Sequence, residues 1–279
     1  MTSSEEVNFA AVERPPSHAE KLAKLKTDIR EVLGLSLTFC LLWFTSTYFY
    51  NYGLEYASIT SSVVLSNTAP MWVYVLALSC IVPANHREKF EPVKAGMIAL
   101  SLAGFGLIAL QDSKSSSSKT SHELLGDILT IASAMSYAIY ATYLKIKVPK
   151  EKEETFRFSA FLGFVGIFND VIMLPVILIF NWTGLETFEW PNRETWLLLS
   201  TNALIGTVIS DYCWARSVVL LGPLITSLGI TLTFPISLMI DVFYHGKTFT
   251  FLYILGSIFI FTAFGVITLY KRPKKDENN

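Results

Sequence analysis

The sequence predicts an all-α integral membrane protein with eight transmembrane helices. Of its 279 residues, 52% are hydrophobic and only 16% are charged, whereas soluble domains average about 25% charged residues. Charge-poor windows long enough to cross a bilayer recur along the chain, and Lys and Arg gather in every second connection between them. The net charge of −1 offers nucleic acid no general attraction, so the sequence predicts no nucleic-acid partner.

The eight predicted spans are charge-poor windows of roughly 20 residues, the length that a helix needs to cross a hydrocarbon layer about 30 Å thick. Helices are expected because lipid offers no hydrogen-bond partner to an open backbone. The windows cover residues 32–54, 56–83, 95–111, 125–144, 158–181, 195–215, 217–240 and 248–270.

The distribution of basic residues predicts the orientation. Lys and Arg are retained on the cytosolic side of a membrane. With eight spans, every Lys and Arg falls on one side except Lys114, Lys119, Arg193 and Lys247. Both termini are therefore predicted to be cytosolic. An odd number of spans would place the termini on opposite sides and remove this asymmetry.

Three soluble segments flank or interrupt the spans. Residues 1–30 form a predicted cytosolic tail, in which Leu22, Leu25 and Ile29 recur at helical spacing. This pattern predicts a short amphipathic helix, which either lies on the cytosolic leaflet or leads into the first span. Residues 112–123 form a Ser-rich luminal linker, and residues 271–279 form a second cytosolic tail.

Enzyme, cofactor and metal sites are not expected. All four histidines, His18, His86, His122 and His245, fall in predicted loops or tails without a second ligand at metal spacing. The sequence contains no nucleophile elbow, no zinc-protease motif and no phosphate-binding loop. We therefore expect a protein without chemical conversion, without a metal and without a cofactor.

Acidic residues inside the spans are the strongest functional signal, because a charge at a helix centre costs about 2.5–3.5 kcal/mol on insertion scales. Asp211 lies in the run Ser210–Trp214 with two aromatic neighbours, and Asp170 follows Asn169 in the fifth span. Each carboxylate either lines a solute pathway or makes an internal structural bond. The sequence leaves both interpretations open.

Two predicted helix interruptions form a second signal. Asn67 and Thr68 precede Pro70 in the second span, and Thr231 precedes Pro235 in the seventh. A proline breaks the backbone hydrogen-bond ladder, and polar neighbours can satisfy the freed carbonyls. Interruptions at corresponding places in two halves point to a transporter binding site.

These two prolines also align an internal repeat. Around them, spans one to three correspond in kind to spans six to eight, whereas spans four and five have no upstream counterpart. Residues 31–111 therefore represent an incomplete first repeat of three helices, and residues 124–270 represent a complete second repeat of five. An intact molecule is expected to have ten helices, as five plus five of opposite orientation.

Four strings carry a resemblance to a known family: AMSYAIY (134–140) followed by Lys145, FLGFVGIFN (161–169), NALIGTVISDYCW (202–214) and LTFPISLMID (232–241). The chain resembles the drug/metabolite transporter superfamily, with its EamA-like repeats. The resemblance is to the branch that contains subfamily F of solute carrier family 35 and fungal vacuolar relatives. It implies a ten-helix fold whose first two helices are lacking here. It also implies an endomembrane location, the vacuolar membrane first and the Golgi next.

The expected function is transport of a small organic solute by alternating access, coupled to protons or to exchange. One alternative is a nucleotide-sugar antiporter, although Lys145 and Arg216 lie too near the cytosolic ends to meet a buried diphosphate. Another is a truncated, non-transporting regulatory partner of a full-length transporter. Such a partner would form a homodimer through small residues such as Gly104 of the third helix and Gly256 of the eighth, residues that equally suit packing within one chain.

The solute pathway is expected to include the polar and aromatic residues singled out above, together with those in the family strings. The aromatic pair of the fourth span is placed on one helix face by its spacing. The candidates are Asn67, Thr68, Tyr137, Tyr140, Asn169, Asp170, Asn202, Asp211, Trp214 and Thr231, with Pro70 and Pro235 as the helix breaks.

Overall fold

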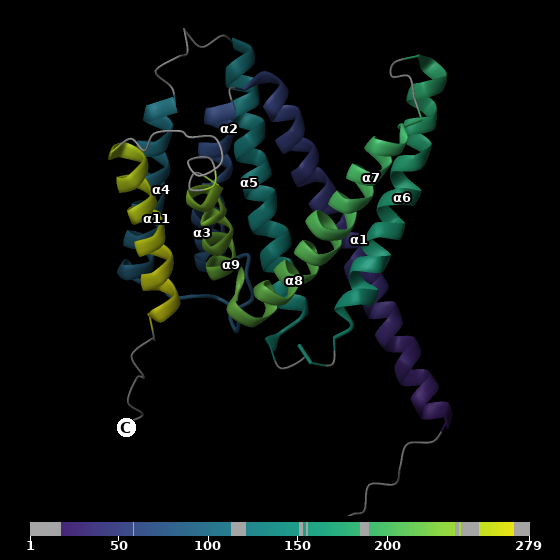
Figure 1. Ribbon diagram of the computed structural model, residues 1–279. Helices are drawn as coiled ribbons and strands as arrows, with labels where there is room; N and C mark the ends of the chain where they lie inside the picture. Colours follow the sequence, from purple (N-terminus) through teal and green to yellow (C-terminus); the bar gives the residue numbers. More distant parts are fainter. Residues whose placement is uncertain are drawn as a thin grey trace, which may run out of the picture.

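The computed structural model describes residues 18–57, 59–112, 121–150, 153–154, 156–184, 190–237, 240 and 251–270. Within these ranges the regular structure is helical (Figure 1). The helices are α1 (His18–Tyr56), α2 (Ile59–Ser66), α3 (Ala69–Leu78), α4 (Pro92–Asp112), α5 (Ser121–Lys147), α6 (Phe158–Thr183), α7 (Arg193–Thr201), the π-helix η3 (Asn202–Ile209), α8 (Ser210–Leu221), α9 (Pro223–Thr231) and α11 (Phe251–Leu269).

The helices agree with the predicted all-α membrane class. Across the described residues, 7 helical segments are long and apolar enough to cross a bilayer. The segment at the predicted seventh span is a shorter apolar helix, Pro223–Ser237. The structure thus supports a multi-pass membrane protein. Its described residues contain seven full-length spans, and the predicted count of eight is not confirmed.

One predicted boundary is wrong. The sixth span was expected to end before Arg216, but α8 continues to Leu221. Arg216 stays inside the helix because its guanidinium donates hydrogen bonds to the buried carboxylate of Glu153. The chain turns instead at Gly222, whose φ of 96° favours glycine. Pro223 then starts α9, where the absence of an N–H costs nothing.

The tails and the linker of the predicted organisation fall largely outside the described residues. Residues 1–17, 113–120 and 271–279 are among those that the structure does not describe. The predicted amphipathic helix is partly described: α1 begins at His18 and runs without a break through the first span to Tyr56.

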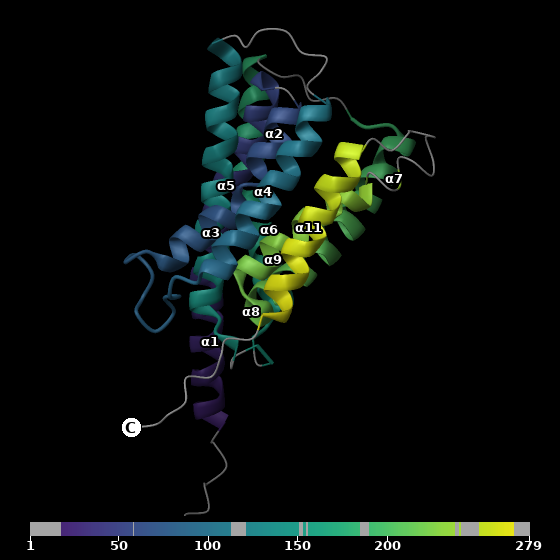
Figure 2. The same ribbon diagram turned by 90° about the vertical axis from the view of Figure 1, so that its left-hand side faces the viewer.

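The chain alternates in direction along the bundle, and α1 begins at the same end at which α11 finishes (Figure 1). Figure 2 shows two layers, one formed by the blue and teal helices α2, α3, α4 and α5 and the other by the green and yellow helices α7, α8, α9 and α11. Helix α5 packs along α1 and also contacts α2 and α3, while α4 packs against α11.

Glycines allow the close approach of α4 and α11. A Cβ atom added to Gly256 would lie 2.6 Å from the backbone oxygen of Gly104, and one added to Gly104 would lie 2.7 Å from the oxygen of Gly256. The two helices therefore meet backbone to backbone. This contact within one chain accounts for Gly104 and Gly256, two of the small residues considered for a homodimer.

The largest buried cluster ties the two layers together at the lower end of Figure 1. Its members come from α1, α5, α6 and α8: Leu35, Phe39, Cys40, Tyr140, Ala141, Leu144, Val148, Phe158, Phe161, Val165, Ala215, Val218 and Val219. By contrast, α7 and η3 contain no buried residue. The bundle is therefore well packed at the end that holds this cluster. The helix formed by α7 and η3 is exposed on all sides.

Candidate functional site

The second span is broken between α2 and α3, two residues before Pro70. The break frees backbone carbonyls, and the polar side chains predicted to compensate for it do so. The amide of Asn67 donates to the oxygen of Val63 at 2.6 Å, and the hydroxyl of Thr68 donates to the oxygen of Leu65 at 2.6 Å. Trp72 in turn donates from Nε1 to the Thr68 hydroxyl at 3.1 Å.

The corresponding break in the second repeat follows α9. The helix is interrupted at Leu232, three residues before the fully buried Pro235. The hydroxyl of Thr231 donates to the oxygen of Leu228 at 2.6 Å, and the hydroxyl of Thr233 donates to the oxygen of Ile230 at 2.7 Å. Both breaks thus combine a proline with hydroxyl groups that bond to the preceding turn.

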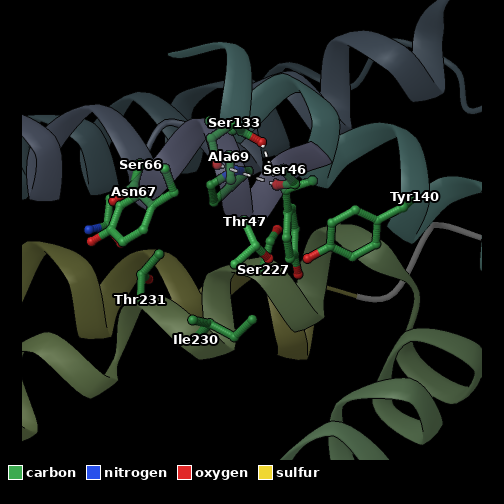
Figure 3. A pocket seen from close by; sticks show the side chains of 14 residues that line it. Ser46, Thr47, Ser66, Asn67, Ala69, Ser133, Tyr140, Ser227, Ile230 and Thr231 are labelled. Carbon is green, nitrogen blue, oxygen red and sulfur yellow. Dashed lines mark hydrogen bonds between the residues drawn. The ribbon is translucent and has the colours of Figure 1, made fainter. Parts of the chain in front are cut away.

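A cavity of about 260 Å³ lies beside these two breaks (Figure 3). It is bounded by α1, the α2–α3 break, α5 and α9, so both layers contribute to its wall. It is lined by Ser46, Thr47, Tyr50, Ser66, Asn67, Ala69, Pro70, Ser133, Ala134, Tyr137, Tyr140, Ser227, Ile230 and Thr231. The structure therefore brings together five of the predicted residues: Asn67, Pro70, Tyr137, Tyr140 and Thr231.

Aromatic rings close the cavity on the side of the buried cluster. Trp214 does not line the cavity but donates from Nε1 to the hydroxyl of Tyr137 at 3.1 Å. Its ring lies 5.5 Å from that of Tyr140 and 5.9 Å from that of Phe39, measured between centroids. Trp214 thus positions the two tyrosines that reach the cavity.

The other predicted residues lie farther from the cavity. Asp211 is half-buried in the first turn of α8, one helical turn before Trp214. Asn169 on α6 has a buried Oδ1 atom for which the described residues provide no hydrogen bond. Asp170 and Asn202 are exposed. Thr68 faces Trp72, and Pro235 is buried next to its own break.

Sequence reasoning missed most of the small hydroxyl residues of the wall. Ser46 and Thr47 of α1, Ser133 of α5 and Ser227 of α9 all line the cavity. Their helical positions carry no marked charge or break. The available signal was their occurrence in apolar windows beside the predicted Tyr137 and Thr231.

The lining combines apolar surface with polar groups that carry no charge. Among the described residues that form it, the polar groups are hydroxyls and one amide, and none is Asp, Glu, Lys or Arg. A search of the described part of the chain also finds no cluster of His, Cys, Asp and Glu that could hold a metal ion. The site can therefore bind through neutral hydrogen bonds and aromatic contacts.

Comparison with known proteins decides the family. The sequence matches the profile described as solute carrier family 35 (SLC35F) over residues 35–271. The chain belongs to solute carrier family 35. The resemblance inferred from the four sequence strings is thereby confirmed. As a family member, this chain is a multi-pass membrane protein.

Relatives of this solute carrier occur in animals and fungi. The chain is 30% identical over 266 residues to solute carrier family 35 member F5 of Macaca fascicularis, covering 95% of this chain and 60% of that protein. It is 33% identical to the thiamine-repressible mitochondrial transport protein THI74 of Saccharomyces cerevisiae, covering 90% and 67%. It is 28% identical to the uncharacterized vacuolar membrane protein YML018C of the same yeast, covering 94% and 67%.

The chain spans 60% of the length of the macaque protein and 67% of the length of each of the two yeast proteins. A solved crystal structure superimposes on it with a TM-score of 0.60, covering 89% of this chain and 92% of that chain at 15% identity. This similarity shows a shared fold and nothing more specific.

Proposed function

We propose that the chain forms the larger part of a secondary transporter that carries a small organic solute by alternating access. The observation that supports this most directly is the uncharged polar cavity at two broken helices, one in each layer of the bundle. A solute bound there contacts both layers. Rocking of one layer against the other would open the cavity to alternate sides of the membrane.

Transport can be tested with the endogenous protein, captured from its own cell through its C-terminal tail and reconstituted in lipid vesicles. Vesicles are incubated with a metabolite extract of the source cell, washed, and analysed by mass spectrometry. We expect at least one small organic solute to accumulate relative to protein-free vesicles, with and without an imposed pH gradient. Identical solute contents in vesicles with the protein and in protein-free vesicles, whether or not a pH gradient is imposed, would contradict the proposal.

The nucleotide-sugar alternative receives no support from the cavity. A diphosphate needs cationic or multiple N–H donors to offset its loss of hydration. The described lining contains no Lys or Arg. Lys145 instead donates to the backbone oxygen of Val219, in the last turn of α8. Its charge therefore stabilises a helix end.

The proposal also includes the location of the protein in the vacuolar membrane and the position of both termini in the cytosol. The name of the yeast vacuolar relative favours the vacuolar membrane. The excess of Lys and Arg at one end of the alternating chain favours cytosolic termini. A solute that accumulates in isolated vacuoles of cells expressing the chain would agree with the vacuolar location.

We further propose that the fold derives from ten helices and that two more helices cover α7 and η3. Helix α5 packs on α1 and contacts α2 and α3, whereas the corresponding face of α7 and η3 is exposed. That face carries polar groups such as Asn202, which lipid solvates poorly. A second copy of the α5–α6 pair would cover it in the symmetric arrangement.

The polypeptide in its own cell provides the test. If the transporter has ten helices, the endogenous protein captured through its C-terminal tail should exceed 31.2 kDa by at least the mass of two spans. A mass of 31.2 kDa would contradict a covalent ten-helix protein and favour the non-transporting partner considered above.

A further inference from the structure

Five of the nine hydroxyl groups that line the cavity direct their hydrogens into the protein. Four of the five bond to a carbonyl of the preceding turn of their own helix, and the fifth, that of Ser46, bonds across to α5. Five lining hydroxyls donate to backbone oxygens: Ser46 to Ser133 at 3.0 Å, Thr47 to Trp43 at 3.0 Å, Ser66 to Val63 at 3.0 Å, Ser227 to Leu224 at 2.9 Å and Thr231 to Leu228 at 2.6 Å.

Because these five hydrogens are bonded to carbonyls, the five hydroxyls can only accept hydrogen bonds from a ligand. A hydroxyl has one hydrogen to donate but two lone pairs that accept. Once the hydrogen is bonded to a carbonyl, the oxygen offers acceptors to a ligand. The Ser227, Thr231 and Ser66 oxygens therefore present an acceptor surface.

Donors are scarce among the residues of the two helix breaks, whereas the hydroxyls of Tyr50, Ser133, Tyr137 and Tyr140 elsewhere in the lining can still donate. The Asn67 amide already donates one of its hydrogens to Val63 at 2.6 Å. The start of α3 adds little, because Met71 and Trp72 donate their N–H groups to the Thr68 oxygen at 2.9 and 3.3 Å and Pro70 has no N–H. The two helix breaks therefore offer a ligand mainly acceptors.

The tyrosines form a different end of the cavity. In Figure 3, Tyr140 lies opposite Ser66, Asn67 and Thr231, with its hydroxyl directed into the space. The Tyr137 and Tyr140 rings contact each other at a centroid distance of 5.1 Å. Because the Tyr137 hydroxyl accepts from Trp214, its own hydrogen is available to a ligand. This end suits an aromatic or apolar body.

We propose that the cavity selects an organic solute that donates several N–H or O–H hydrogen bonds from an aromatic or apolar body, and that it rejects carboxylates and phosphates. The assignment rests on the proposed transport function. Amine, amide or hydroxyl donors meet the acceptors near the two helix breaks. An anion would lose its hydration there without gaining enough donors in exchange.

Three small probes of similar shape test this selectivity: 2-phenylethylamine, phenylacetamide and phenylacetate. Each is titrated into the purified full chain in detergent, and affinity is measured by isothermal calorimetry and by the shift in melting temperature. We expect both donor-bearing probes to bind and phenylacetate to bind at least about tenfold more weakly, since it leaves several acceptors unpaired.

A matched pair of variants locates the binding. Thr231→Val removes an acceptor from the wall, whereas Thr233→Val removes a hydroxyl that bonds in the same way, to Ile230 at 2.7 Å, without lining the cavity. We expect Thr231→Val to lower the affinity for phenylacetamide by about three- to tenfold. Thr233→Val should leave its affinity unchanged.

The outcomes separate this inference from the transport proposal. Equal binding of phenylacetate, equal effects of the two variants, or no binding of any probe would overturn the selectivity. If the donor probes bind as expected but the vesicles accumulate no solute, transport is contradicted and the site stands. If the vesicles accumulate an anion through a process that Thr231→Val impairs, transport stands and the selectivity is overturned.

Discussion

Replacing Gly256 with alanine is expected to destabilise the bundle by about 1–3 kcal/mol, the usual cost of overpacking. The added methyl group would lie 2.6 Å from the backbone oxygen of Gly104 and 2.7 Å from Cγ1 of Ile108. The Ile108 side chain can turn away, but the backbone oxygen cannot move without shifting α4. We therefore expect a clear fall in the melting temperature, measured by size-exclusion chromatography of heated, detergent-solubilised protein.

The control for this variant lies on the same helix. Gly265 has no neighbouring atom within 4 Å of an added Cβ, so Gly265→Ala introduces no clash and gains helix propensity. Its melting temperature should equal or exceed that of the unmodified protein. Equal melting temperatures for the two variants would show that α4 and α11 do not meet at Gly104 and Gly256.

Replacing Asp211 with asparagine is expected to abolish the pH dependence of uptake while leaving the amount of membrane protein unchanged. Asp211 is half-buried one helical turn before Trp214, whose ring contacts that of Tyr140 in the cavity wall. A carboxylate there can take up a proton on one side and release it on the other. The amide of asparagine has nearly the same shape and cannot.

The exposed Asp170 on α6 supplies the matched control. Asp170→Asn removes the same charge from a membrane helix but lies outside the cavity wall, so its pH profile should match that of the unmodified protein. Uptake in vesicles is measured at several external pH values for all three proteins. An unaltered profile for Asp211→Asn would exclude this residue as the proton carrier.

The sequence predicted most of the architecture because the relevant forces are local. Apolar length defines a span, and a proline with polar neighbours defines a break. The second rule holds at Pro70 and Pro235, where the helices are interrupted two or three residues earlier. The boundary near Arg216 was misplaced because its partner, Glu153, comes from a distant connection. A window along the chain cannot reveal such an ion pair.

The cavity was less predictable for a related reason. A serine or threonine in a membrane helix bonds to its own backbone whether it faces a cavity, another helix or lipid. Ser46 and Ser227 therefore look no different in sequence from hydroxyls that line nothing. Asp170 and Asn202 show the converse: their polarity suggested a pathway, yet both are exposed on helices with little cover. Only the packing distinguishes these cases.

The unbroken course of α1 has a mechanical consequence. Its 39 residues extend about 58 Å, nearly twice the thickness of a hydrocarbon layer of about 30 Å. The helix must therefore lean steeply, project beyond the membrane surface, or both. Because the helix is continuous from its first turns to Ser46 and Thr47, a change in its tilt would also move these two residues. A change of inclination imposed at its outer end is delivered directly to the cavity wall.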